Sequence, residues 1–287
     1  MDFYVPTPDE VLEAVQAQSA PLVFDSPHSG TWHPPDFAFV CDKQRLRRAE
    51  DTYVDELWAA ASGAGCGFLK AFFPRSYIDP NRSLTDIDET LFEAPWPEPV
   101  EPGEKSKAGM GLIRRLSLPD EPIYDRKLSI AEAQHRIRHY YQPYHATLEQ
   151  LIEAAFSKWG NVWHVNCHSM KEHGNAMNVD AGRRRADFVL GDREGTTCGP
   201  ELLHTVQSFL RNKGYSVSVN DPYKGLELVR RHGRPSEGRH SLQIEINRAL
   251  FLDEVSVTKT EGFQALQADL KELVIRLVAA QAATSVS

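Results

Sequence analysis

Apolar and polar residues alternate along the chain in blocks that predict strands and helices in turn. Short apolar runs closed by turn residues are typical of buried strands. They predict strands at 22–25, 66–73, 161–167, 187–190, 215–219 and 241–247. Apolar residues at helical spacing predict helices at 7–18, 50–62, 129–159, 200–213 and 260–280. The alternation favours an α/β fold: one domain over residues 1–287, with a mixed, mostly parallel sheet flanked by helices.

Capping residues predict where two of these helices begin. Thr7 and Glu10 form a capping box, with Pro8 at the first helical position, and Ser129 and Glu132 form another. Pro143 lies inside the helix expected at 129–159 and is expected to kink or split it.

Residues 84–124 break the pattern. The segment is rich in Pro, Gly, Glu and Lys and has no clear period. A structureless loop of this length is uncommon in a compact domain. We therefore expect an irregular excursion, which either covers the site as a lid or contains short strands. Residues 110–116 are the segment that best fits a strand.

Composition narrows the class of protein. Hydrophobic residues make up 41% and charged residues 25%, as in ordinary globular proteins. The net charge of −8 argues against a nucleic-acid partner. No secretory signal and no apolar run long enough to span a membrane is expected. Four scattered cysteines indicate a reducing compartment, so a cytoplasmic location is expected.

Four polar residues lie at or near the predicted strands. His28 follows the strand at 22–25, His168 ends the strand at 161–167, Glu245 lies in the strand at 241–247, and Asp51 opens the next helix. Two histidines, one carboxylate and an open fourth position form a catalytic zinc site. The alternative is that each histidine is a hydrogen-bonded loop residue and that Glu245 is a buried ion-pair partner.

A set of short motifs follows one another in a fixed order. They read P-H-S-G from Pro27, D-T-Y-V-D-E-L from Asp51, D-P-N-R from Asp79, C-H-S-M from Cys167, N-D-P-Y-K-G from Asn220, R-H-G-R-P from Arg231 and H-S-L-Q-I-E-I-N-R from His240. With these motifs the chain resembles the N-formylglutamate amidohydrolase family, which is related to zinc carboxypeptidases and to acylaspartate and succinylglutamate deacylases.

The resemblance implies a phosphorylase/hydrolase-like fold of the zinc-exopeptidase type, with one divalent metal ion, zinc before others. It implies His28, Asp51 and His168 as ligands, with Glu50 as the alternative for the middle one because relatives use Glu. It implies Glu245 as the catalytic carboxylate and Asn81 with Arg82 as the pair that holds the substrate carboxylate. Asn166 departs from the family pattern, which more often has Asp at this position.

The implied activity is cleavage of N-formyl-L-glutamate to L-glutamate and formate, in histidine degradation. Such a small anionic substrate has two carboxylates, so two cationic anchors are expected. Arg82 is the first, and it also counts as catalytic because an Arg is expected at the oxyanion. Candidates for the second anchor, and for lining the pocket, are Arg75, the run 183–185, Arg231, His232 and His240.

Two alternatives to this activity remain open. One is another N-acyl amino acid deacylase or a metallocarboxypeptidase on the same fold. The other is a binding protein for acidic amino acids. The sequence does not set the oligomeric state.

Overall fold

A seven-stranded mixed sheet forms the centre of the computed structural model, which describes residues 3–119 and 121–284. Met1, Asp2, Asp120 and 285–287 lie outside the described residues. The strands run in the order β1-β3-β2-β6-β9-β7-β8. Their bounds are Leu12–Val15 (β1), Leu22–Ser26 (β2), Gly67–Ala71 (β3), Val162–Met170 (β6), Phe188–Gly191 (β7), Val217–Val219 (β8) and Arg239–Asn247 (β9).

The central strands β3, β2, β6 and β9 are parallel to one another. Strand β1 is antiparallel to β3, β7 is antiparallel to β9, and β8 is parallel to β7. The prediction of a mixed, mostly parallel sheet is confirmed. Parallel strands place their carboxyl ends at one edge, where ligands bind in open α/β sheets.

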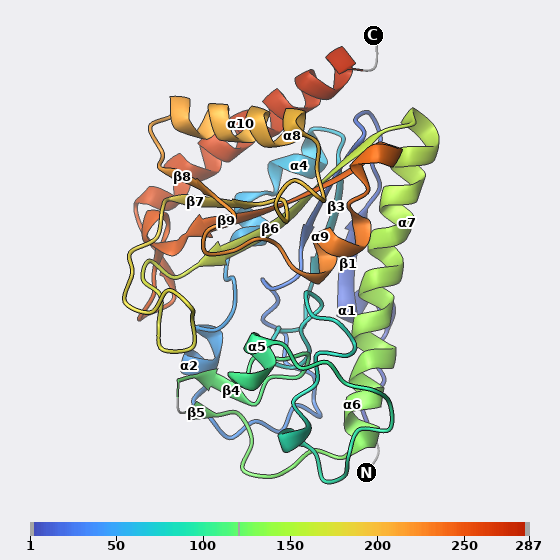
Figure 1. Cartoon of the computed structure of the whole chain (residues 1–287), viewed down its shortest axis with the longest axis vertical. Helices are drawn as coiled ribbons and strands as arrows, with labels where there is room; N and C mark the ends of the chain where they lie inside the picture. The colour runs from blue at the N-terminus through green and yellow to red at the C-terminus, as the bar shows by residue number, and fades with distance from the viewer. Residues whose placement is uncertain (1–2, 120, 285–287) are drawn as a thin grey trace.

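Helices cover both faces of the sheet (Figure 1). One apolar cluster joins the sheet to α3 (Val54–Leu57), α4 (Ala60–Gly63), α8 (Pro200–Asn212) and α10 (Gly262–Thr284). A second cluster joins the other face to α6 (Ile130–Arg136), α7 (Gln142–Trp159) and α9 (Glu227–His232). No helix among the described residues is long and apolar enough to cross a bilayer.

Strands β6 and β9 each bury one polar face. Because side chains alternate across a strand, Trp163, Val165 and Cys167 enter the first apolar cluster, while His164, Asn166 and His168 turn to the opposite side. Strand β9 repeats the arrangement, with Ser241, Gln243 and Glu245 paired in register with those three polar residues. A buried polar band therefore crosses two adjacent strands.

The excursion at 84–124 lies at the carboxyl edge of the sheet (Figure 1, teal to green). It contains η1 (Glu89–Leu91), α5 (Glu104–Lys107), β4 (Leu116–Leu118) and β5 (Glu121–Pro122). The strand expected at 110–116 is wrong, because Leu112 and Ile113 bury in the second apolar cluster without strand pairing. The remaining elements are α2 (Lys43–Arg47), η3 (Pro235–Glu237), η4 (Arg248–Leu250), β10 (Leu252–Asp253) and β11 (Thr258–Lys259).

Two predicted helices are corrected. The helix expected at 7–18 is the single turn α1 (Pro8–Val11), after which β1 pairs with β3 at the sheet edge. The helix expected at 50–62 is broken into α3 and α4, and it begins only after Tyr53, whose φ of 67° is left-handed. The interruption expected at Pro143 is confirmed, because the π-helical turn η2 (Ile137–Tyr141) separates α6 from α7.

Candidate active site

The polar edge of the sheet gathers residues from four parallel strands. His28 lies two residues beyond the end of β2, and the segment Asp79–Arg82 follows β3. His168 and Glu245 are register partners near the ends of β6 and β9. The prediction that Gln243 and Glu245 share one face is confirmed, since Nε2 of Gln243 donates to Oε1 of Glu245 at 3.0 Å.

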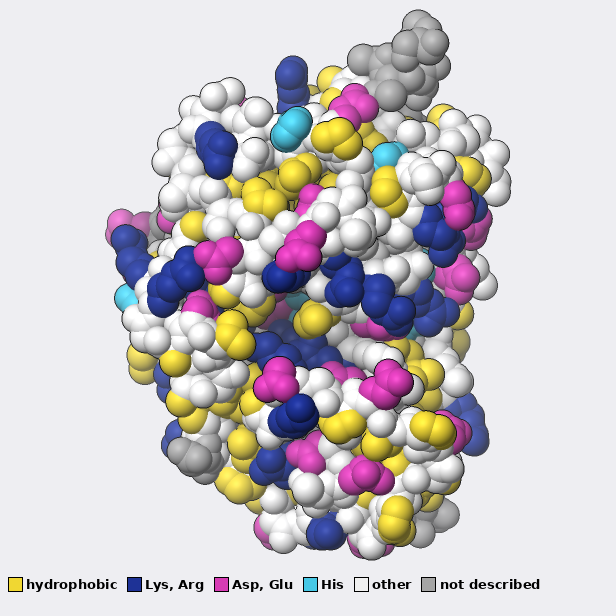
Figure 2. Space-filling model, in the orientation of Figure 1, with side chains coloured by type: hydrophobic (Ala, Val, Ile, Leu, Met, Phe, Trp, Pro, Cys, Tyr) yellow, Lys and Arg dark blue, Asp and Glu magenta, His cyan; other side chains and the backbone are white. Residues whose placement is uncertain are grey.

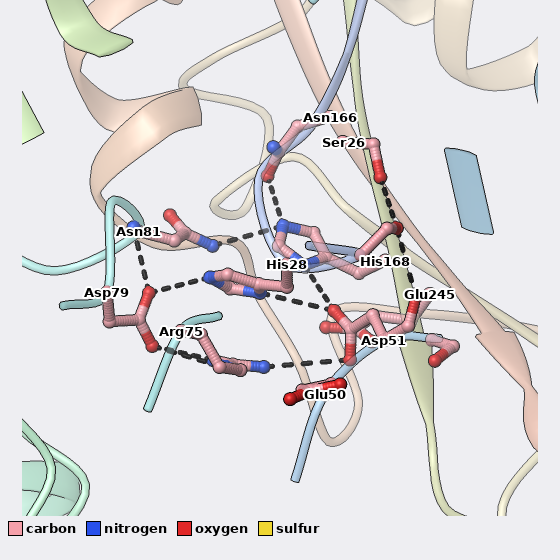
Figure 3. Close-up of polar contacts among 12 residues, drawn as sticks. Ser26, His28, Glu50, Asp51, Arg75, Asp79, Asn81, Asn166, His168 and Glu245 are labelled. Atoms are coloured by element: carbon pink, nitrogen blue, oxygen red, sulfur yellow. Dashed lines mark hydrogen bonds and ion pairs between the residues drawn. The ribbon is translucent and has the colours of Figure 1, made fainter. Parts of the chain in front are cut away.

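His28, Asp51 and His168 form one buried group (Figure 3). Nδ1 of His28 lies 3.1 Å from Oδ2 of Asp51, and Nδ1 of His168 lies 3.0 Å from the same oxygen. One donor atom from each residue lies within 4.8 Å of the other two. Two imidazole nitrogens and one carboxylate oxygen at this spacing fit a divalent metal ion of the zinc type.

The far sides of both imidazoles are held by acceptors. Nε2 of His28 lies 2.6 Å from Oδ1 of Asp79, and Nε2 of His168 lies 2.7 Å from Oδ1 of Asn166. An acceptor at Nε2 keeps the proton on that nitrogen and leaves the Nδ1 lone pair directed at Asp51, as metal-binding histidines require. This second observation also fits a metal site.

Asp51 is fixed by its backbone and by its other oxygen. Its N–H donates to the carbonyl of His28 at 3.0 Å, which ties the two loops together. Oδ1 accepts from Nη2 of Arg248 at 3.0 Å, and Nη1 of Arg75 lies 3.6 Å from it. Oδ2 is therefore the oxygen left to face the histidines. Asp51 does not open a helix, because α3 begins only at Val54.

Glu50, the alternative middle ligand, turns away from the histidines. Among the described residues its buried carboxylate has no hydrogen-bond partner, and Nε of Arg47 lies 3.6 Å from it. Burial raises the pKa of Glu50 to about 7, against the opposing charges of Arg47 and Arg248. The structure thus brings Asp51 to the two histidines and keeps Glu50 apart from them.

Glu245 stands beside this group with a carboxyl that is 8% exposed. Burial raises its pKa to about 7, with His168 opposing the shift and Asp51 adding to it. A buried carboxyl that titrates near neutrality can both accept and return a proton at physiological pH.

Gly30 lets the loop that carries His28 pack against the strand end beside it. A Cβ at this position would lie 2.4 Å from the backbone of Phe72 and Phe73. Only glycine allows this approach. The glycine of the P-H-S-G motif is therefore a packing requirement that sets the position of His28.

A cavity of about 520 Å³ opens beside the group. Figure 2 shows the hollow across the middle of the molecule, with Lys and Arg side chains gathered in it. Six basic residues line the cavity, namely Arg75, Arg82, Lys105, Arg114, Arg193 and Lys224. Its wall also includes Asn81, His168, Tyr223, Gln243 and Glu245. Such a wall suits a small anionic ligand.

The predicted anchors Asn81, Arg82 and Arg75 all reach this cavity. Nδ2 of Asn81 lies 3.2 Å from Nε2 of His168 but donates to Oε1 of Gln243 at 3.4 Å, because the proton on that nitrogen is directed at Asn166. Oδ1 of Asn81 accepts from the N–H of Leu228 at the start of α9. Arg82 donates through Nε to the carbonyl of Met110 at 2.9 Å. Arg75 donates through Nε and Nη2 to one oxygen of Asp79, so it holds the partner of His28.

Three other predicted residues, Arg231, His232 and His240, are not among the described residues that line this cavity. Arg231 is 40% exposed and faces Glu149 at 3.4 Å, because α9 turns it outward. His232 is buried against His164, with ring centroids 5.9 Å apart. His240 lies at the opposite end of β9 from Glu245 and accepts from the N–H of Gly199 through Nδ1.

Of the three arginines at 183–185, two lie on the surface and one is buried at the edge of the cavity. Arg183 and Arg184 are exposed and pair with Asp221 and Glu172. Arg185 is buried, donates to both oxygens of Asp180, and stacks over Tyr223 at the edge of the cavity. Only the last of the three contributes to the site.

Sequence reasoning missed Asp79, Arg248, Arg114 and Lys105. Asp79 opens the motif D-P-N-R, and Arg248 closes the motif H-S-L-Q-I-E-I-N-R, so their places in these motifs could have identified both residues. Arg114 and Lys105 belong to the excursion at 84–124, where no periodicity points to them.

Comparison with known proteins supplies the family. The family model described as "N-formylglutamate amidohydrolase" matches residues 20–252. The chain belongs to this family. A solved N-formylglutamate amidohydrolase from Ralstonia eutropha is 49% identical, covering 96% of this chain and 99% of its own, with a TM-score of 0.91.

More distant relatives agree. N-formylglutamate deformylases from Pseudomonas aeruginosa and Pseudomonas putida are 26% and 25% identical, each match covering 94% of this chain and 97% of the relative. A gene product of Agrobacterium tumefaciens is 18% identical, with a TM-score of 0.68 over 97% of this chain, and shows that the fold is shared.

Proposed function

We propose that this chain is a metal-dependent amidohydrolase that cleaves N-formyl-L-glutamate to L-glutamate and formate. The observation that carries the proposal is the His28–Asp51–His168 group, with Glu245 beside it, in the wall of a cavity rich in basic side chains. The names of the relatives support the substrate.

His28, Asp51 and His168 would hold one divalent ion, for which we propose zinc on the basis of the donor set. When bound, such an ion supplies a Lewis acid that polarises the formyl oxygen and lowers the pKa of water. Asp79 and Asn166 orient the two imidazoles for this task.

Glu245 is the proposed general base. Its buried carboxyl, whose pKa is raised to about 7 in the metal-free protein, takes a proton from the attacking water and later returns it to the leaving nitrogen. Gln243 donates to Oε1 and so leaves Oε2 for the proton. Glu245 lies in the same cavity wall as His168, which keeps both steps within one enclosed site.

Two arginines take the negative charges of the substrate. Arg75 lines the cavity and lies 3.6 Å from Asp51, so we propose that it stabilises the oxyanion of the tetrahedral intermediate. Arg82, with Asn81 beside it, is proposed to hold the α-carboxylate. Removal of water from a buried guanidinium strengthens such a contact.

The test is a substrate panel of N-formyl-, N-acetyl- and N-succinyl-L-glutamate, assayed with the metal-replete protein. We expect release of formate from the first, at a rate at least about 10-fold above the other two because added bulk must fit a formed pocket. A preference for another acyl group makes the chain a different deacylase. Tight binding without turnover makes it a binding protein.

Three finer features are part of the same proposal. Cys41, Cys66, Cys167 and Cys198 are all unpaired, which supports a reducing, cytoplasmic location. The resemblance supports a role in histidine degradation. Both apolar clusters pack on one sheet, which supports a single catalytic domain.

A further inference from the structure

The excursion at 84–124 sends two basic side chains into the cavity. Arg114 is buried, with 5% of its surface exposed, and Lys105 lies on α5 near the ring of Tyr223. Both line the cavity that contains His168 and Glu245.

The backbone that carries Arg114 is held firmly. The carbonyl of Leu112 accepts from the N–H of Asp79 at 2.8 Å, and the N–H of Leu112 donates to Asp86 at 2.9 Å. Leu112 and Ile113 are buried in the second apolar cluster. The guanidinium of Arg114 is thus positioned by a packed segment that is hydrogen-bonded to the segment bearing Asp79.

Arg114 has no acceptor of its own among the described residues. Its Nε is buried without a hydrogen-bond partner, and its nearest carboxylate oxygen, Oδ2 of Asp79, is 3.8 Å away. That oxygen already accepts two hydrogen bonds from Arg75. Burial and the neighbouring charge of Arg75 hold the pKa of Arg114 well below its usual range. A buried cation without hydrogen bonds is costly unless an anion completes it.

Lys105 is in the same situation. Among the described residues, no carboxylate lies within hydrogen-bonding distance of its Nζ, which lies 5.8 Å from the centroid of the Tyr223 ring. Burial and the charges of Arg82 and Arg114 lower the pKa of Lys105 to about 8. The next residue but one, Lys107, is exposed and pairs with Glu104.

The other basic residues of the cavity are already engaged. Arg75 binds Asp79, Arg193 donates to the carbonyl of Gly225, and Lys224 pairs with Glu194. Arg82 is oriented by Met110 and Asn81 and is the proposed α-carboxylate anchor. The carboxylates in the wall make their contacts with other groups: Glu104 pairs with Lys107, Asp180 pairs with Arg185, and Glu245 accepts a hydrogen bond from the neutral amide of Gln243.

We propose that Arg114 and Lys105 form a second anion-binding subsite, which takes the side-chain carboxylate of the N-formyl amino acid while Arg82 takes its α-carboxylate. This inference rests on the proposed function. It gives the excursion at 84–124 a role: the segment supplies the charges that select an acidic side chain.

The test compares N-formylglutamate with N-formylglutamine, which has nearly the same shape but no side-chain charge. Full-length, metal-replete Arg114→Met and Lys105→Met are expected to lose about 10- to 100-fold in kcat/KM toward N-formylglutamate, mainly through KM, because each removes a charge-assisted contact. Toward N-formylglutamine both variants are expected to stay within about threefold of the wild type, because no side-chain charge is lost there.

Neighbouring residues provide matched controls. Arg115→Met and Lys107→Met remove the same charges outside the cavity wall, where half-buried Arg115 pairs with Asp88 and exposed Lys107 pairs with Glu104, and they are expected to change the kinetics toward neither substrate. Equal losses toward both substrates in Arg114→Met and Lys105→Met overturn the subsite, as does no loss in either. Lys105 is only half-buried, so Lys105→Met tests the subsite even where Arg114→Met fails to fold.

Failure of the proposed function has a different signature. If the metal-replete wild type hydrolyses neither compound, the proposed activity is overturned. The subsite is then tested by calorimetric titration, which measures the affinity of the protein for the same two compounds. The subsite then requires tighter binding of N-formylglutamate by the wild type and loss of that difference in both variants. Equal affinities for the two compounds in the wild type overturn it.

Discussion

The side-chain oxygen of Asn166 lies 2.7 Å from Nε2 of His168. The amide cannot turn round, because its Nδ2 donates to Oδ1 of Asp25 at 2.8 Å. Burial alone would raise the pKa of Asp25, but hydrogen bonds from His164, Tyr144 and Asn166 outweigh it and keep the carboxylate ionised. The buried carboxylate of Asp25 thus fixes the orientation of the Asn166 amide, and the amide oxygen keeps the proton of His168 on Nε2.

Asn166→Leu is therefore expected to weaken metal binding. Loss of a partner that orients a metal-binding histidine typically raises the dissociation constant about 10- to 100-fold. The measurement is competitive titration of the divalent ion against a chelator. Cys167→Ala, on the opposite face of the same strand, is the control and is expected to keep wild-type affinity. Equal affinity of Asn166→Leu and the wild type contradicts the role of the amide.

The middle ligand gives a second prediction. Asp51→Asn is expected to lose the divalent ion, because Oδ2 of Asp51 is the oxygen that faces both histidines. Glu50→Gln is expected to keep it, since that carboxylate faces Arg47 instead. Elemental analysis of the purified proteins checks both, with circular dichroism to show that each is folded. Retention in Asp51→Asn together with loss in Glu50→Gln would move the assignment by one residue.

The sequence predicted the core of the site because its residues lie in compact motifs at strand ends. His28 and His168 both precede serine in similar contexts, and the two-residue period of β9 placed Glu245 beside Gln243. It failed where position depends on packing between distant segments. The backbone beside Arg114 is held by one hydrogen bond from Asp79 to Leu112 and one from Leu112 to Asp86, which no local sequence pattern predicts.

The errors in the fold have similar causes. Leu12 and Val15 are three residues apart, a spacing that fits a helix. They nevertheless form strand β1, which pairs antiparallel with the edge of β3. The sequence offers Arg231 as one candidate for the second cationic anchor, but the structure places it outside the cavity wall. The face that a residue occupies on a short helix such as α9 is set by contacts, here with Glu149, and not by the motif.

The capping box predicted at Ser129 yields a test of stability. Burial opposes ionisation of Glu132, but Arg126 and Ser129 outweigh it and lower the pKa of Glu132 to about 2. Because this value is below that of the unfolded chain, the stabilisation is complete above about pH 4.5 and is lost as the pH falls toward about 2.

Glu132→Gln is accordingly expected to lower the free energy of unfolding by about 1 kcal/mol at pH 7, as loss of a helix cap typically does. The difference is expected to shrink steadily below about pH 4.5. Urea unfolding at several pH values measures it. Glu149→Gln, exposed on α7, is the control. A difference that stays constant down to the lowest pH would exclude the ionised cap as its source.

Arg82 is tested by a substrate that lacks the group it binds. Arg82→Ala is expected to raise KM for N-formylglutamate about 10- to 100-fold with kcat little changed, because a charge-assisted contact to a carboxylate is lost. N-formyl-4-aminobutanoate has no α-carboxylate, so the same variant is expected to change its KM far less. Arg230→Ala, exposed on α9 and paired with Glu227, is the control. Equal effects on both compounds assign Arg82 to a different part of the substrate.

Glu245 separates catalysis from binding. Glu245→Gln keeps the shape of the side chain and its contact with Gln243 but cannot accept a proton. General acid–base groups supply about 10²- to 10⁴-fold in rate, so kcat is expected to fall by at least about that factor while metal content and KM change little.

The pH profile gives a second, independent reading of the same residue. Burial raises the pKa of Glu245 to about 7 in the metal-free protein, so its base form is lost as the pH falls through that value. A divalent ion on the neighbouring ligands favours the ionised carboxylate and lowers this pKa. The acid limb of kcat/KM in the metal-replete wild type is therefore expected at or below about pH 7, and to be absent from the residual activity of Glu245→Gln. If Glu245→Gln retains near-wild-type kcat and the same acid limb, the base is another group. His232 and His240 do not qualify for that role, since neither lines the cavity that holds His168.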